Sequence, residues 1–224
     1  MVGLPPARVL VLDLDGTLVD TVPDLAAALN RLMTGRRLAG FTFPETAAMV
    51  GDGVARLVEK AFAARGTTPD QAAIADFSAD YAASAAVDSR LYPHVLTTLG
   101  GLLSEGWRLA VCTNKRHDLA IQLLDALNLT RRFAAIVGAD AVVNKKPHPD
   151  HFIETVSRAG GELGRSVMVG DSTTDVKSAQ GAGAPVIVYR PGYGDVAADD
   201  MGADAIIDDY AILDVTAEAL LARA

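Results

Sequence analysis

The stretch Arg8-Val-Leu-Val-Leu-Asp-Leu-Asp-Gly-Thr17 decides the fold of this chain. Its apolar first half is short and lacks polar alternation, which is typical of a strand buried on both faces of a parallel sheet. Asp13 and Asp15 follow, and alternation along the backbone sends both carboxylates to the same side. Gly16 allows a sharp turn close to a ligand. A turn that merely ends a strand explains a bare Asp-x-Asp, but buried carboxylates at this place favour a cation or ligand site.

Further runs rich in Val and Ile predict more buried strands later in the chain. They are Arg108–Cys112, Ala135–Gly138, Ser166–Val169 and Pro185–Val188, and Ala205–Ile207 can add a last one. Apolar residues at helical spacing lie between them, for example from Val95 to Leu103. Strands that alternate with helices predict an α/β fold, with a Rossmann-like, doubly wound parallel sheet.

Residues 18–88 break this alternation, because they contain helical patterns and no credible strand. Apolar side chains keep helical spacing from Val22 to Met33, with Gly35 past the end, and again from Val54 to Phe62. A segment of this length is too long for a loop. We therefore expect two domains: a core formed by residues 1–17 and 89–224, and a helical insert formed by residues 18–88.

Composition excludes several classes of protein. The chain has 224 residues, 50% of them hydrophobic, and 20 Lys and Arg against 28 Asp and Glu, for a net charge of −8. An acidic chain without a basic run does not predict binding to nucleic acid. No apolar run is long enough to span a membrane, and Met1–Leu12 is too short for a signal peptide. The lone Cys112 is expected in the core, and its lack of a partner fits a cytoplasmic protein.

Polar residues follow three later strands where each of them ends. Thr113 and Asn114 follow the second strand, Lys146 lies in a proline-bounded loop after the third, and Asp171 and Asp175 follow the fourth. Taken singly, each has a plain explanation such as helix capping or a solvated lysine. Open parallel sheets, however, bind ligands at the carboxyl ends of their strands. Together these residues predict one site.

These motifs resemble the signatures of the haloacid dehalogenase-like superfamily of phosphohydrolases, and closely those of the bacterial phosphoglycolate phosphatases. The four signatures appear in order as Asp13–Thr17, Thr113, Lys146 and Gly170–Asp175. The insert matches the position of the family's helical cap, and its Gly51-Asp-Gly53 resembles the cap loop that reaches over the substrate. The resemblance also implies the strand order 5-4-1-2-3, which places the fourth strand beside the first.

The resemblance implies a role for each carboxylate. Asp13 is expected to be the nucleophile that forms an aspartyl-phosphate, and Asp15 the general acid and base. Mg²⁺ is expected to bind the Asp13 carboxylate, the Asp15 backbone carbonyl and Asp171, with Asp175 one hydrogen bond or water away.

The remaining signature residues would contact the phosphate. By the same resemblance, Thr113 and the Asn114 backbone amide hold phosphoryl oxygens, and Lys146 neutralises charge in the transition state. His148 and His151 lie beside this loop and are expected at the surface or as helix caps.

The expected substrate is a small phosphomonoester, with 2-phosphoglycolate the leading candidate. A cap large enough to cover the site excludes proteins and nucleic acids, and Arg56 is a candidate for binding a substrate carboxylate. A capped sugar-phosphate mutase (β-phosphoglucomutase-like) or a pyrophosphatase of the same superfamily shares the core signatures and stays open. A receiver domain fits less well because of the large insert and the acid expected at Asp15. A dehalogenase fits less well because it is not expected to retain Asp15-Gly-Thr17 and Asp171 for metal chemistry. The chain is expected to be a monomer or a homodimer.

Overall fold

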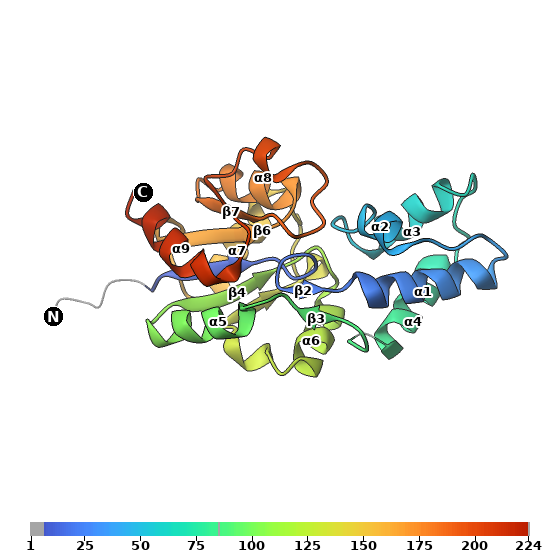
Figure 1. Ribbon diagram of the computed structural model, residues 1–224, viewed down its shortest axis with the longest axis horizontal. Helices are drawn as coiled ribbons and strands as arrows, with labels where there is room; N and C mark the ends of the chain where they lie inside the picture. Colours follow the sequence, from blue (N-terminus) through green and yellow to red (C-terminus); the bar gives the residue numbers. More distant parts are fainter. Residues whose placement is uncertain (1–6, 85, 224) are drawn as a thin grey trace.

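The computed structural model describes residues 7–84 and 86–223 and contains a six-stranded parallel sheet (Figure 1). Its strand order is β5-β4-β1-β6-β7-β8. The strands are β1 (Val9–Leu12), β4 (Arg108–Cys112), β5 (Ala135–Val137), β6 (Ser166–Gly170), β7 (Val186–Tyr189) and β8 (Ala205–Ile207). The predicted order of the first five strands is confirmed, and the anticipated last strand adds a sixth.

Helices cover both faces of this sheet. Leu10 and Leu12 of β1 point into one apolar cluster and Val9 and Val11 into another, as alternation along a strand requires. The first cluster packs under α5 (Val95–Ser104), α6 (His117–Ala126) and α9 (Leu213–Leu221), and the second under α7 (Pro149–Arg158) and α8 (Thr173–Gly181). Short 3-10 turns lie at Thr130–Arg132, Ala139–Ala141, Leu163–Arg165, Ala198–Asp200 and Tyr210–Ile212. The doubly wound α/β prediction is confirmed.

The insert forms a separate helical layer at one end of the sheet (Figure 1). Its helices are α1 (Val22–Gly35), α2 (Phe43–Ala47), α3 (Val54–Ala63) and α4 (Ala73–Ser84). Leu25, Leu29, Val58 and Phe77 belong to an apolar cluster of its own, which also takes in Leu119 from α6. The insert thus buries its apolar stripes mostly against one another.

The prediction that residues 18–88 contain no strand was wrong. Val19–Asp20 (β2) pairs antiparallel with Arg90–Leu91 (β3), where the chain leaves the sheet region and returns to it. Two-residue strands carry no periodicity, so only the pairing reveals them. The short helix α2 was missed for the same reason, and Gly35 lies inside α1 rather than after it.

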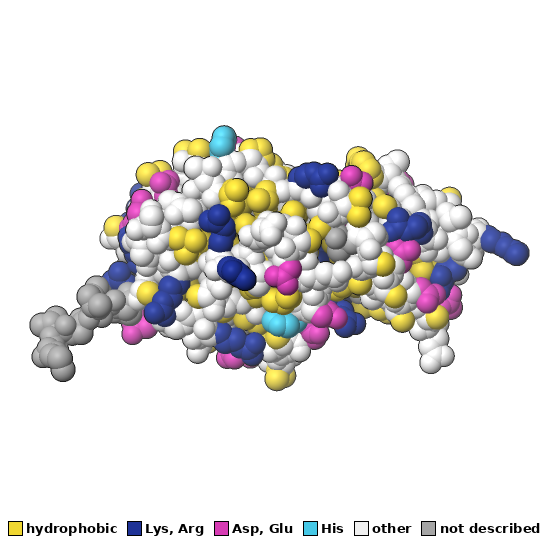
Figure 2. Space-filling view, turned by 90° about the horizontal axis from the view of Figure 1, so that it is seen from below, with side chains coloured by type: hydrophobic (Ala, Val, Ile, Leu, Met, Phe, Trp, Pro, Cys, Tyr) yellow, Lys and Arg dark blue, Asp and Glu magenta, His cyan; other side chains and the backbone are white. Residues whose placement is uncertain are grey.

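Two sequence-based exclusions concern the surface and the amino terminus. No helix in the described parts of the chain is long and apolar enough to cross a membrane. On the face drawn in Figure 2, Lys and Arg side chains are scattered among acidic and uncharged ones. Of the Met1–Leu12 stretch, residues 1–6 lie outside the described residues.

Candidate active site

The strand order brings the predicted site residues to one edge of the sheet. β4 and β6 both pair with β1, with Leu12 opposite Val111 and Val169. Residues that follow these strands therefore become neighbours, although Leu12 is 99 positions from Val111 and 157 from Val169. Asp13, Thr113 and Asp171 are all buried at this edge.

Lys146 reaches this edge from the loop after β5. Its Nζ lies 3.0 Å from Asp13 Oδ1 and 2.6 Å from Asp175 Oδ1, and its side chain is fully buried. Burial opposes the charged form, but these two carboxylates more than offset it, so the pKa of Lys146 lies above its usual value. The ammonium is therefore fixed between two acids rather than solvated.

His151 holds the backbone of Lys146, which the sequence did not reveal. The Lys146 N–H donates to His151 Nδ1 at 3.2 Å, and His151 Nε2 lies 3.0 Å from the Val137 carbonyl oxygen. Burial and the nearby ammonium lower the pKa of His151 to about 4, so the ring is neutral, with its proton on Nε2. The expected surface or capping role of His151 was wrong, because the side chain is completely buried. His148 does cap α7 and accepts a hydrogen bond from the Asp150 N–H at 3.2 Å.

Asp175 has both carboxylate oxygens engaged within the protein. Oδ1 contacts Lys146, and Oδ2 accepts hydrogen bonds from the Ser172 hydroxyl at 2.6 Å and the Ser172 N–H at 3.1 Å. Ser172 and Asp175 form the capping box that starts α8. Capping and site chemistry thus coincide in one residue.

The acidic cluster fits a divalent cation. One carboxylate oxygen each from Asp13, Asp171 and Asp175 lies within 4.8 Å of the others. Burial, and then the neighbouring carboxylates, raise the pKa of Asp171; burial raises that of Asp13 to about 7 even against the pull of Lys146. The Lys146 ammonium alone does not neutralise three carboxylates, so the cluster favours a further cation. Mg²⁺ suits this site because it prefers oxygen ligands. Asp175 forms an ion pair with Lys146 at 2.6 Å, whereas the hydrogen bonds of Asp171 come from uncharged donors. The charge of Asp171 is therefore the less compensated of the two, which favours Asp171 over Asp175 as a direct metal ligand beside Asp13.

At Gly16 the backbone passes so close to this cluster that a side chain does not fit. Its φ is +82°, and a Cβ atom there would lie 2.2 Å from Asp171 Oδ2. Asp171 also accepts hydrogen bonds from the Thr17 hydroxyl at 3.0 Å and the Tyr193 N–H at 2.7 Å. A side chain at position 16 would therefore displace Asp171.

Tyr193 is a further site residue, to which the sequence alone assigns no role. Besides its bond to Asp171, its hydroxyl accepts from the Thr21 N–H at 2.8 Å and contacts Asp20. The loop after β7 is thereby bonded to the start of the insert. The available signal was Gly192-Tyr-Gly194, whose glycines allow the backbone to pass close to Asp171.

Asp15 has two donors on the same oxygen. The Thr21 hydroxyl donates to Asp15 Oδ1 at 2.7 Å, and the Lys115 ammonium lies 2.8 Å from the same atom. The Lys115 side chain is 3% exposed. Sequence reasoning missed Lys115, although it directly follows Thr113 and Asn114 at the end of β4.

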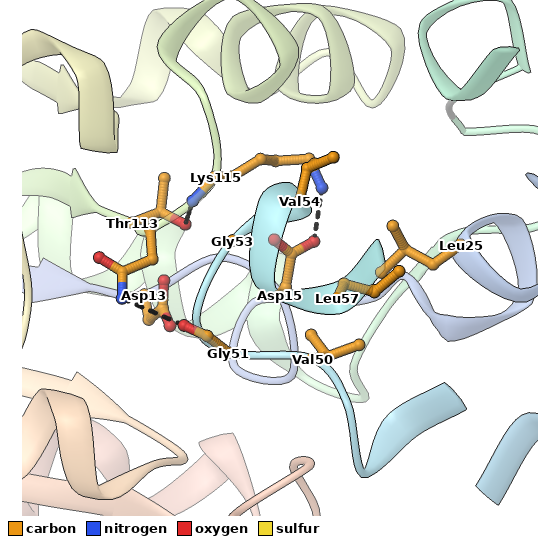
Figure 3. A pocket seen from close by; sticks show the side chains of 11 residues that line it. Asp13, Asp15, Leu25, Val50, Gly51, Gly53, Val54, Leu57, Thr113 and Lys115 are labelled. Carbon is orange, nitrogen blue, oxygen red and sulfur yellow. Dashed lines mark hydrogen bonds and ion pairs between the residues drawn. The ribbon is translucent and has the colours of Figure 1, made fainter. Parts of the chain in front are cut away.

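The insert covers the sheet edge with an apolar roof (Figure 3). Between them lies a cavity with about 420 Å³ of empty space, its open mouth included. The roof side chains are Leu25, Val50, Val54 and Leu57, opposite Asp13, Asp15, Thr113, Asn114 and Lys115. A space of this size suits a small molecule rather than a polymer.

Two contacts bring the Gly51–Gly53 loop of the insert to the end of β4. Asn114 Nδ2 donates to the Gly51 carbonyl oxygen at 3.1 Å and to the Lys146 carbonyl oxygen at 3.1 Å. Gly53 has a φ of +91°, and a Cβ atom there would lie 2.8 Å from the Asn114 carbonyl oxygen. Only a loop with little side-chain bulk fits this closely against the sheet edge.

Arg56 does not line this cavity. Its side chain is 60% exposed and pairs with Glu59 along α3 at 2.6 Å. The expectation that Arg56 binds a substrate carboxylate was therefore wrong.

Cys112 lies buried in the core as expected.

Comparison with known proteins agrees with this geometry. Residues 10–189 match the family described as "Haloacid dehalogenase-like hydrolase". A protein named phosphoglycolate phosphatase from Agrobacterium fabrum is 41% identical over 217 residues, covering 95% of this chain and 93% of that protein. Another of that name from Caulobacter vibrioides is 39% identical over 202 residues, covering 88% and 85%.

The fold agrees with a solved structure as well. The crystal structure of a predicted phosphoglycolate phosphatase from Haemophilus somnus 129pt superposes with a TM-score of 0.87 at 28% identity, covering 96% of this chain and all of the other. These similarities support phosphatase activity for this protein and confirm the resemblance inferred from its motifs. The chain belongs to the haloacid dehalogenase-like hydrolase family.

Proposed function

We propose that this protein hydrolyses 2-phosphoglycolate to glycolate and phosphate through an aspartyl-phosphate on Asp13, with Mg²⁺ as cofactor. The observation that carries the proposal is the convergence of Asp13, Lys146 and Asp171 at the sheet edge, where Asp13 lines a cavity covered by apolar side chains of the insert. The substrate choice is supported by the relatives named phosphoglycolate phosphatase, which are 41% and 39% identical to this chain.

In the first step, an Asp13 carboxylate oxygen attacks phosphorus, and the bond from phosphorus to the ester oxygen breaks. Asp15 gives its proton to the departing oxygen, so that glycolate leaves as an alcohol. Asp13 and Asp15 both line the cavity, so one substrate can contact both of them. Asp13 would act on its phosphorus and Asp15 on its ester oxygen. In the second step, Asp15 takes a proton from water, and the water oxygen attacks phosphorus to release phosphate and free Asp13.

The Asp13 and Asp171 carboxylates and the Asp15 backbone carbonyl would hold Mg²⁺, with Asp175 outside the first ligand sphere. The ion would neutralise the negative charge that otherwise keeps a carboxylate away from a phosphate. Asp175 keeps Lys146 in place, as its 2.6 Å contact indicates.

Three residues would contact the phosphoryl group during both steps. Lys146 offsets its charge, and the Thr113 hydroxyl and the Asn114 backbone N–H bind its oxygens. Transfer of a phosphoryl group needs mainly such positioning and charge neutralisation.

Residues 18–88 would act as a cap domain on a core formed by residues 1–17 and 89–224. Closing an apolar roof over the reacting groups excludes water and strengthens the electrostatic interactions beneath it. The cavity also restricts entry to small phosphomonoesters.

The test is phosphate release, with Mg²⁺ present, from 2-phosphoglycolate, glucose 1-phosphate, pyrophosphate and a phosphopeptide. We expect the largest kcat/KM for 2-phosphoglycolate. Preference for another member of the panel would remove this substrate, and isomerisation of glucose 1-phosphate without phosphate release would indicate a mutase instead.

A further inference from the structure

The cavity contains one basic side chain among the described residues that line it, and that side chain is Lys115. The acids Asp13 and Asp15 lie beside it, and the remaining lining residues are uncharged. A carboxylate that enters a confined, largely apolar space needs a compensating cation. A substrate carboxylate in this cavity therefore needs an ammonium or guanidinium group within reach.

Other nearby basic groups are engaged elsewhere. Lys146 is enclosed between Asp13 and Asp175, and Arg56 pairs with Glu59 at the surface. Lys60 of the insert pairs with the Asp52 carboxylate at 2.8 Å, and Lys145 donates to the Asp52 carbonyl oxygen at 2.7 Å. None of these lines the cavity, so Lys115 is the group in position.

The local geometry lets Lys115 bind a second anion without leaving Asp15 unsupported. The ammonium lies 2.8 Å from Asp15 Oδ1 and 4.6 Å from the centre of the Tyr81 ring in α4 (Figure 3 shows the contact with Asp15). Asp15 keeps the Thr21 hydroxyl at 2.7 Å if the ammonium is shared. The face of Tyr81 favours a cation next to it and limits where the ammonium moves.

The proposed reaction places a carboxylate next to this ammonium. Asp15 protonates the ester oxygen of the substrate, and in 2-phosphoglycolate the carboxylate carbon is two bonds away from that oxygen. With bonds of about 1.5 Å, the carboxylate then lies only about 2–4 Å from the ester oxygen. The group that touches Asp15 is therefore also within reach of the carboxylate.

We propose that Lys115 determines substrate specificity by binding the carboxylate of a small phosphorylated hydroxy acid. This inference rests on the proposed phosphatase function and adds the residue that recognises the acid. The recognition element comes from the end of β4 rather than from the helices of the insert, with Tyr81 of the insert keeping the ammonium in place.

The experiment compares two substrates of nearly equal shape, 2-phosphoglycolate and its amide, 2-phosphoglycolamide, in the wild type and in Lys115→Met. The amide keeps the phosphate ester and loses only the negative charge. Since hydrogen bonds to charged groups are worth about 1.5–3 kcal/mol, we expect wild type to prefer the acid by about 10- to 100-fold in kcat/KM, mainly through KM. Lys115→Met should abolish the preference, and Lys115→Arg should restore part of it.

Lys177→Met is the matched control, because Lys177 is an exposed lysine on α8 and should leave both rates unchanged. Equal kcat/KM for acid and amide in wild type would overturn the proposal without any variant. An equal fall in kcat/KM for the acid and the amide in Lys115→Met would also overturn the proposal, because Lys115 would then act only through Asp15. Absence of wild-type activity on both would instead contradict the proposed function.

Discussion

The two walls of the cavity are built in different ways. At the sheet edge, polar side chains are buried and bonded to one another, as in the contact of Lys146 with Asp13 and Asp175. The opposite wall, formed by Leu25, Val50, Val54 and Leu57 of the insert, is apolar (Figure 3). A hydrogen bond from Asn114 Nδ2 to the Gly51 carbonyl oxygen joins the two walls.

The sheet edge therefore carries the reacting groups, and the roof controls which molecules reach them. Side chains at strand ends are fixed by the register of the sheet, so they hold reacting groups with little freedom. The apolar wall supplies no proton or charge and instead shapes the space and removes water. Changes to the reacting groups at the sheet edge, such as Asp13, should therefore abolish turnover. Changes to the roof, and to Lys115 at the sheet edge, should alter substrate binding.

The largest effect is expected for Asp13→Asn. An amide is a poor nucleophile, so kcat should fall by at least about 10³-fold. Lys146 keeps its contact with Asp175, so the fold should persist, which circular dichroism checks. Asp125→Asn, an exposed residue on α6, is the control and should retain full activity. Substantial turnover by Asp13→Asn would assign the nucleophile to another residue.

Removal of the metal should also stop turnover. A chelator should abolish phosphate release, and added Mg²⁺ should restore it, because Lys146 supplies the one ammonium that contacts the acidic cluster among the residues the structure describes. Binding should also be visible without substrate: at about 100 times its Kd, a ligand stabilises the folded state by about 2.7 kcal/mol. We expect Mg²⁺ to raise the Tm of wild type and much less that of Asp171→Asn. Full activity in chelator would contradict the assignment.

A charge in the roof should affect binding rather than chemistry. Val54→Asp places a carboxylate opposite the acidic edge, where it repels an anionic substrate, and we expect KM to rise by about tenfold with kcat changed less. Val54→Asn controls for polarity, and Ala55→Asp, exposed on the same helix, for charge. A collapse of kcat at constant KM would show that the roof takes part in chemistry.

The smallest effect on catalysis is expected for Asp24→Asn in α1, which should instead lower stability. Asp24 is buried and accepts bonds from the Ala86, Asp88 and Ser89 N–H groups and the Ser89 hydroxyl, at 2.6–3.0 Å. These bonds fasten the two ends of the insert together. Their loss should cost about 1–3 kcal/mol in the free energy of unfolding at neutral pH.

The pH dependence of that penalty follows from the pKa of Asp24. Burial alone would raise this pKa, but the donated hydrogen bonds lower it below its usual value. The carboxylate therefore stabilises the fold fully above the unfolded pKa of about 3.9, and the penalty of Asp24→Asn should shrink as pH falls below it. Denaturant unfolding measures the penalty, with exposed Asp88→Asn as control. A penalty that stays constant down to pH 3 would contradict this origin.

The sequence predicted the elements whose signal is local. Buried strands such as β1 and β4 have continuous apolar runs, and Asp13 and Asp171 follow such runs directly. What it missed depends on contacts between distant segments: β2 with β3, His151 with Lys146, and Lys115 with Asp15. Arg56 was misplaced because helical spacing alone does not tell which side of α3 meets the cavity.

A search for the covalent intermediate tests whether Asp13 is the nucleophile. Enzyme mixed with 2-phosphoglycolate carrying labelled phosphorus is quenched in acid within the first turnover, digested, and its peptides are examined by mass spectrometry. We expect label on Asp13, formed and lost at rates that match phosphate release, and none in Asp13→Asn. Phosphate release from wild type with no protein-bound label at any time, or label on Asp15 instead, would contradict it.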